Sequence, residues 1–196
     1  MGAFEGEYMS DRDHLTYSRE VMTRKYAETY RKREELKLPK RCGAIGDAAL
    51  RDNIRIERLA LENGLRRIGN SVALREARLP ESVEKIGDGC FADCPRLKEA
   101  YIPKRLEKIP SGAFKEDRRL SKVTFADDSV LSRIGKDAFS ECVELKEILL
   151  PPKVTEIEDR AFYRCKHLKS VHFPEGLKRI GREAFYFCSM ETLELP

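Results

Sequence analysis

Hydrophobic positions recur along the chain with a period of about 23 residues. The clearest marker is an Ala-Phe pair or a close variant of it, with phenylalanines at Phe91, Phe114, Phe139, Phe162 and Phe185. An isoleucine stands five residues before each phenylalanine, and a leucine or methionine stands near six residues after it. Such a period, held in phase, predicts a solenoid in which each coil buries its apolar face against its neighbours.

An alternating pair of apolar residues follows each marker, and a proline closes most of these runs. The pairs are Ala100/Ile102, Val123/Phe125, Ile148/Leu150, Val171/Phe173 and Leu193/Leu195. Alternation of this kind predicts a short strand, and proline suits its end. Each coil is therefore expected to hold a short strand, a turn, a second extended piece ending in Ile-Gly, and a helical turn through Ala-Phe.

The N-terminal half fits the same template less cleanly, with eight strand steps from Leu36 to Leu195. The coil at 62–80 is short, because five residues are missing before Leu74, whereas a two-residue insertion lies around 127–130. We expect a solenoid of about seven coils over 35–196. Residues 1–34 differ, and apolar positions from about Arg12 to Arg33 predict an amphipathic helix. It is expected to cap the first coil, and a docking helix for a partner is the alternative.

The repeated columns resemble the BspA-like, or Treponema-type, leucine-rich repeats over roughly Glu35 to Pro196. The Leu-x-x-Leu-x-Leu core is present, as in Leu168-x-x-Val171-x-Phe173, but the later Asn column of standard leucine-rich repeats is not. The resemblance implies a right-handed α/β superhelix with short parallel strands, in a bacterial family. It also implies adhesion to, or binding of, host or partner proteins.

Charge is high but balanced, with 38 basic and 34 acidic residues and a net charge of +4. This does not by itself indicate nucleic acid or a membrane. No apolar run approaches the ~18 residues of a membrane span. The N-terminus carries no secretory signal as written, which favours the cytoplasm, as do unpaired thiols. The family resemblance favours the cell surface, so the compartment stays open.

Six cysteines could indicate a metal site or disulfides, but their positions within the repeat place them in core columns. Cys94, Cys142, Cys165 and Cys188 share one column, in which Asp117 occupies the odd coil. Cys90 takes the Ala column, and Cys42 an apolar column. Free cysteine is at home in a core. Neither Cys90-x-x-x-Cys94 nor Cys165-x-His167 has a usual zinc spacing, so no metal or cofactor is expected.

No catalytic constellation is visible. The histidines are His14, His167 and His172, and none has a Ser or Cys in its own column to form a nucleophile–base set. The recurrent Ile-Gly glycines are turn residues and do not make a phosphate loop. The sequence therefore predicts a protein that is not an enzyme.

Two surface columns are candidate binding sites. The outward strand position varies between coils and reads Lys37, Ala60, Arg78, Tyr101, Thr124, Leu149, His172 and Glu194. Repeat proteins bind through such faces, so a protein partner is expected on Arg78, Tyr101, Thr124, Leu149 and His172. An ordinary exposed strand face is the alternative.

The second column stands just before the recurrent isoleucine and is mostly basic: Arg67, Lys85, Lys108, Arg133, Glu156 and Arg179. Stacked coils would turn it into a basic stripe that binds a polyanion or an acidic partner, unless neighbouring acids neutralise it. Nucleic acid is not expected, because no aromatic residues are interleaved. The chain ends on a strand, and we expect an uncapped edge there that could self-associate. A fragment of an adhesin-like surface protein remains a further alternative.

Overall fold

The structure is a computed structural model of the chain, and it describes residues 20–22, 35–37, 42–46, 58–60, 67–68 and 76–190. The regular elements of these residues are short strands. They are β1 (Glu20–Met22), β2 (Glu35–Lys37), β3 (Cys42–Ile45), β4 (Arg58–Ala60), β5 (Arg67–Ile68), β6 (Glu76–Arg78), β7 (Lys85–Ile86), β8 (Glu99–Ile102), β9 (Lys108–Ile109), β10 (Lys122–Phe125), β11 (Arg133–Ile134), β12 (Glu147–Leu149), β13 (Glu156–Ile157), β14 (Ser170–His172) and β15 (Arg179–Ile180).

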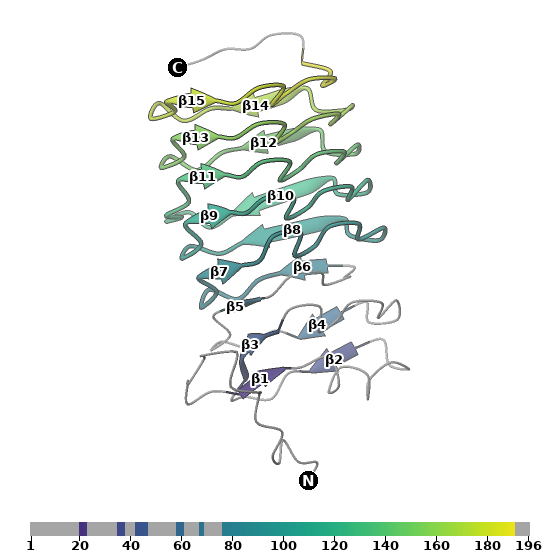
Figure 1. The fold of residues 1–196 in the computed structure, drawn as a ribbon, viewed down its shortest axis with the longest axis vertical. Helices are drawn as coiled ribbons and strands as arrows, with labels where there is room; N and C mark the ends of the chain where they lie inside the picture. Colours follow the sequence, from purple (N-terminus) through teal and green to yellow (C-terminus); the bar gives the residue numbers. More distant parts are fainter. Residues whose placement is uncertain are drawn as a thin grey trace.

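Stacking of coils brings equivalent strands side by side, and all their pairings are parallel. Figure 1 shows the resulting column of coils, with odd-numbered strands along one side and even-numbered strands along the other. The odd ladder consists of β1-β3-β5-β7 and β9-β11-β13-β15. The even ladder consists of β2-β4, β6-β8-β10 and β12-β14. The predicted solenoid of short parallel strands is thus confirmed.

A single proline accounts for the break in the odd ladder. The residue after each recurrent isoleucine donates its N–H to the isoleucine carbonyl one coil earlier, as Gly135 does to Ile109 at 2.8 Å and Gly181 to Ile157 at 2.7 Å. Pro110 holds this position in the coil of β9 and has no N–H to donate. β7 and β9 are consequently not paired with each other.

The expected helical turn through Ala-Phe is wrong for the described coils, because the segment forms a series of turns. Alternate N–H groups donate to the next coil, as Phe114 does to the Ala138 carbonyl at 2.8 Å. The groups between them close tight turns, as Lys115 does to Gly112 at 3.0 Å. Inter-coil bonds therefore use the donors that an α-helix would need. Two residues of each such segment take positive φ, as Gly112 and Glu116 do.

The core lies between the two ladders and is built from the predicted columns. The phenylalanines Phe91, Phe114, Phe139, Phe162 and Phe185 stack along the solenoid with ring centroids 5.2 Å apart. The first four are fully buried, as are Ile109, Ile134 and Ile157 of the odd ladder. The spacing read from the sequence therefore identifies the core residues of these coils.

The N-terminal helix is wrong for Glu20–Met22, which form β1. β1 pairs with β3 and places Met22 beside Ile45, so Met22 extends the isoleucine column by one coil. Met22 stands 23 residues before Ile45, which is the repeat period. Ladder hydrogen bonds from β3 outweigh a local helical preference here. The rest of the expected cap lies outside the described residues, as does most of the shortened coil at 62–80.

Candidate functional site

The outward strand residues lie in line along the even ladder. The register places Arg78 beside Tyr101 and Tyr101 beside Thr124, across β6, β8 and β10. Leu149 lies beside His172 across β12 and β14. β10 and β12 are not paired, and the two-residue insertion follows β10 directly. The structure thus brings the five predicted residues together in two groups, which we name the strand face.

Tyr101 is held by residues of the preceding coil. Its hydroxyl donates a hydrogen bond to one carboxylate oxygen of Glu81, and the other oxygen accepts the Lys104 N–H at 3.2 Å. The Arg78 Cζ lies 5.7 Å from the centroid of the Tyr101 ring, in cation–π range. The hydrogen bond to Glu81, followed by burial, raises the pKa of Tyr101 to about 12. The Tyr101 side chain is therefore held by Glu81 at its hydroxyl and by Arg78 at its ring.

Leu149 is the most exposed large hydrophobic residue of the described chain, at 69%. It lies on β12, next to the place where the even ladder is interrupted. His172, beside it in register, is exposed, and its Nε2 lies 3.3 Å from the Ser170 hydroxyl. A single exposed leucine is ordinary on a protein surface. Within the strand face it is the one large aliphatic side chain, so it is the apolar contact point of that face.

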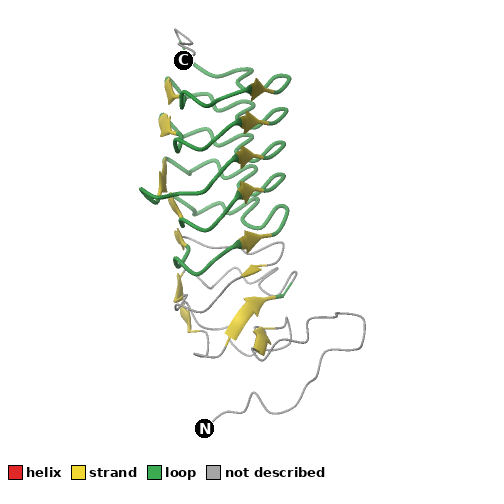
Figure 2. Cartoon of the chain, turned by 90° about the vertical axis from the view of Figure 1, so that its left-hand side faces the viewer, coloured by secondary structure: helices red, strands yellow, loops and turns green. Residues whose placement is uncertain are grey.

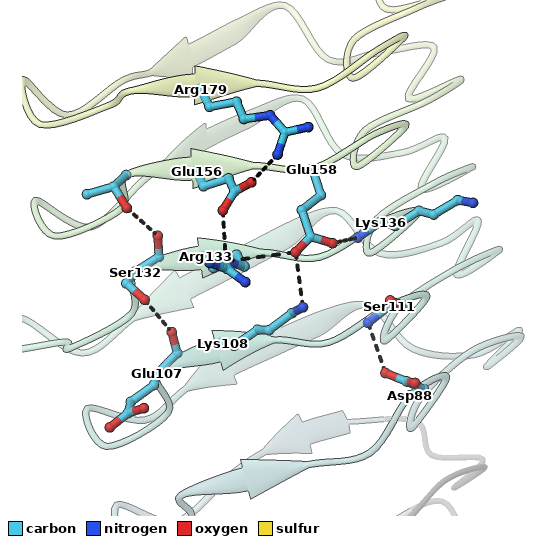
Figure 3. A network of polar contacts seen from close by, with 11 residues as sticks. Asp88, Glu107, Lys108, Ser111, Ser132, Arg133, Lys136, Glu156, Glu158 and Arg179 are labelled. Atoms are coloured by element: carbon cyan, nitrogen blue, oxygen red, sulfur yellow. Dashed lines mark hydrogen bonds and ion pairs between the residues drawn. The ribbon is translucent and has the colours of Figure 1, made fainter.

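The predicted basic stripe is largely neutralised by two glutamates (Figure 3). The Glu156 carboxylate lies 2.9 Å from the Arg133 Nε and 2.7 Å from an Arg179 guanidinium nitrogen. The Glu158 carboxylate lies 3.0 Å from the Lys108 Nζ. Arg67 contributes only its backbone to the description, and Lys85 is exposed. Three of the five predicted residues are therefore ion-paired.

Sequence reasoning overlooked a set of lysines at the start of four even-numbered strands, β8, β10, β12 and β14. In each coil the chain turns a corner of the solenoid there. We name Lys98, Lys122, Lys146 and Lys169 the corner lane; all four are exposed. Within the part of the chain that the structure describes, none of them forms an ion pair. The signal in the sequence was the column just before the strand, which reads Lys98, Ser121, Lys146 and Lys169.

The cysteines occupy the core, as predicted for Cys90, Cys94, Cys142 and Cys165, and Cys188 is half-buried. The side chain of Cys42 lies outside the described residues. Cys142 and Cys165 each donate their thiol to a phenylalanine carbonyl of the preceding coil at 3.1 Å. Burial raises the pKa of both thiols well above the usual value. A hydrogen bond with Cys165 lowers the pKa of Cys188.

In the described ranges between residues 20 and 190, no group of three or more His, Cys, Asp or Glu side chains is arranged to hold a metal ion. No helix in those ranges has the length and apolarity needed to cross a bilayer.

The repeat can be compared with known families. A model of the BspA type leucine rich repeat region matches six copies, over residues 23–131 and 132–196. The chain belongs to this family. Its members are repeat scaffolds that typically bind other molecules and are generally not catalytic. The match begins at residue 23, directly after β1.

Solved structures share the fold of this family member. A leucine-rich repeat protein from Bacteroides ovatus is 26% identical, with a TM-score of 0.63 over 80% of this chain and 47% of its own. One from Eubacterium ventriosum is 22% identical, with a TM-score of 0.76 over 82% of this chain and 44% of its own. The leucine-rich repeat protein of T. pallidum is 28% identical, with a TM-score of 0.59 over 80% of this chain and 66% of its own. The chain therefore spans under half the length of the first two. Comparison with curated proteins gave no match.

Proposed function

We propose that the chain is a non-enzymatic scaffold that binds a protein partner through the strand face. The observation that carries the proposal is the variable outward column beside core positions that are apolar in every coil. Arg78, Tyr101, Thr124, Leu149 and His172 change chemical character from coil to coil, whereas the positions between them stay apolar. Variation confined to one face is the expected signature of a repeat protein that recognises a partner.

Rigid display is the proposed mechanism. The stacked core fixes the backbone under the strand face, and Glu81 and Arg78 hold Tyr101 in one orientation. Binding then orders few groups, so little conformational entropy opposes it. Tyrosine and arginine are residues on which binding energy commonly concentrates. Leu149 would supply the apolar contact of the strand face.

The basic stripe is a weaker candidate for a polyanion site. Glu156 and Glu158 neutralise Lys108, Arg133 and Arg179, so a polyanion would have to displace their carboxylates. We therefore do not assign the function to that stripe.

The test compares partner capture from a lysate of the source organism by the wild type and by the Tyr101→Asp/Leu149→Asp double variant. The control is Ser132→Asp/Thr155→Asp, which adds the same charge on the turns before β11 and β13, away from the strand face. We expect the first variant to lose the partner and the control to keep it, with unchanged circular dichroism spectra. The captured protein is then purified and its affinity measured. Equal capture by all three proteins would contradict the proposal.

A further inference from the structure

The positive charge of the described coils concentrates at one corner. Residues 95–99, 118–122, 143–147 and 166–170 form the corner that leads into β8, β10, β12 and β14. These segments hold eight lysines and arginines against three glutamates. The chain as a whole is nearly balanced, with a net charge of +4. The excess at this corner is therefore a local feature of the surface.

Backbone hydrogen bonds between coils align Lys98, Lys146 and Lys169 in one column, in which the coil of β10 has Ser121, and Lys122 lies one residue further along, beside Glu99. The Ser121 N–H donates to the Lys98 carbonyl at 2.9 Å, and the Lys169 N–H donates to the Lys146 carbonyl at 2.9 Å. Neighbouring strands lie about 4.8 Å apart, so lysines on four successive coils span on the order of 15 Å along the solenoid axis. About five residues of an extended peptide cover that length.

The lysines of the corner lane differ from the basic residues of the odd ladder in their ion pairing. Lys108, Arg133 and Arg179 each have a carboxylate within 3.0 Å, supplied by another coil. In the lane, Glu99 lies beside Lys122 in register, and Glu147 follows Lys146, but neither forms an ion pair with a described residue. Like charges on adjacent coils repel one another. An external anion would relieve that repulsion.

The apolar surface beside the lane selects between kinds of anion. Thr124, Leu149 and His172 follow the lane residues along the same strands, and Leu149 is 69% exposed. Single-stranded nucleic acid would need aromatic platforms, and Tyr101 is the only aromatic residue at an outward position on β6, β8, β10, β12 and β14. A sulfated glycan would leave Leu149 uncovered. A polypeptide supplies both carboxylates and an aliphatic side chain.

We propose that the strand face and the corner lane together bind an extended acidic polypeptide segment. Its carboxylates pair with Lys98, Lys122, Lys146 and Lys169, and an apolar side chain of the segment covers Leu149. This inference rests on the proposed function, because it names the chemistry of the partner for the same face. The acidic segment is inferred because its negative charge complements the positive charge of the corner lane. Electrostatic steering by these lysines would speed association at low salt.

The test measures the fluorescence anisotropy of a short labelled peptide, rich in glutamate and aspartate around one central leucine. A second peptide replaces the acids by glutamine and asparagine. Lys146→Glu/Lys169→Glu reverses two charges of the lane, and Lys153→Glu/Lys178→Glu reverses two exposed lysines beyond the other end of the same strands. We expect the acidic peptide to bind, and the first variant to weaken it by about tenfold or more while the second changes it little.

Several results would overturn the inference. One is equal binding of the acidic and amide peptides, and another is an equal loss in both charge-reversal variants. A third is a sulfated oligosaccharide that competes with the peptide and binds Leu149→Asp as tightly as the wild type, because the site would then accept polyanions in general. Failure of the acidic peptide, with a non-acidic protein still captured through Tyr101 and Leu149, would refute this inference and leave the proposed function standing. Peptide binding unaffected by Leu149→Asp would refute the apolar half of the site.

Discussion

Asp117 is a carboxyl group inside a column of thiols. It is fully buried, and its Oδ1 accepts the Cys94 N–H at 2.7 Å. Its Oδ2 has no hydrogen-bond partner in the structure. Burial raises the pKa of Asp117 to about 9, with a smaller contribution from the charge of Asp93 and an opposing one from the Cys94 N–H. The folded protein therefore holds Asp117 protonated at neutral pH.

This pKa makes stability depend on pH. The unfolded chain releases the proton near pH 3.8, whereas the folded chain keeps it until about pH 9. The unfolded state thus binds fewer protons between these values, and the contribution of Asp117 to stability is lost as pH rises. We expect Asp117→Asn to be more stable than the wild type at pH 8, on the order of 2 kcal/mol. The gain should shrink toward pH 4.

Urea unfolding at acidic and alkaline pH measures this difference. Asp127→Asn is the control, because Asp127 is exposed. The stability of this variant should depend on pH in the same way as that of the wild type. A stability difference between Asp117→Asn and the wild type that does not change with pH would show that Asp117 does not titrate as described. Asp117→Cys, which restores the residue of the neighbouring coils, should behave like Asp117→Asn.

Glycines of the odd ladder control how closely two turns approach. A Cβ added at Gly135 would lie 2.7 Å from the Ile109 carbonyl oxygen, and one at Gly181 would lie 2.4 Å from the Asp159 nitrogen. In the preceding coil, the residue equivalent to Gly135 is Pro110, and the residue equivalent to Gly181 is Glu158. Both of these residues carry a side chain. Backbone atoms cannot move aside as a flexible side chain can. These glycines are therefore required by contact with the preceding coil.

Gly135→Ala is expected to destabilise the protein by about 1–3 kcal/mol, because overpacking shifts the backbone of the preceding coil. Gly176→Ala is the matched control, since its Cβ would lie 3.7 Å from the Pro152 carbonyl oxygen, an ordinary contact. Thermal unfolding followed by circular dichroism measures both. Equal melting temperatures for the two variants would contradict the close approach at Gly135.

The phenylalanine stack links the described coils into one cooperative unit. Phe139 lies in its middle, with ring centroids 5.2 Å from those of Phe114 and Phe162. Each coil of a solenoid contacts only its neighbours, so cooperativity depends on the interfaces between them. A weakened middle interface should let the two ends unfold separately.

We expect Phe139→Ala to lower the free energy of unfolding by about 3–5 kcal/mol, because it leaves a cavity in the stack. The m-value of urea unfolding should also fall, as the transition divides into two. Phe187→Ala is the control, since Phe187 is 57% exposed, and it should change stability by no more than about 1 kcal/mol. A single sharp transition with an unchanged m-value in Phe139→Ala would mean that the ladders alone couple the coils.

At each scale, some features could be predicted from the sequence and others could not. The repeat period predicted the buried columns and the outward positions, because each coil repeats the same inside-outside pattern. The turns through Ala-Phe were mistaken for helix, because their donors bond to the next coil, a partner that local propensity does not include. β1 was missed for the same reason, since its hydrogen bonds come from β3.

The period and the alternation within each coil therefore suffice to assign the family, the solenoid and the members of the core. Which charges remain open to a partner depended on the stacking of coils. Glu158 reaches Lys108, 50 residues earlier, and together with Glu156 it neutralises much of a stripe that looks mostly basic in the sequence. Among the residues that the structure describes, no carboxylate forms an ion pair with the corner lane, so the lane keeps its charge there. Pairing between side chains is set by distances across coils, and these follow only from the three-dimensional stack.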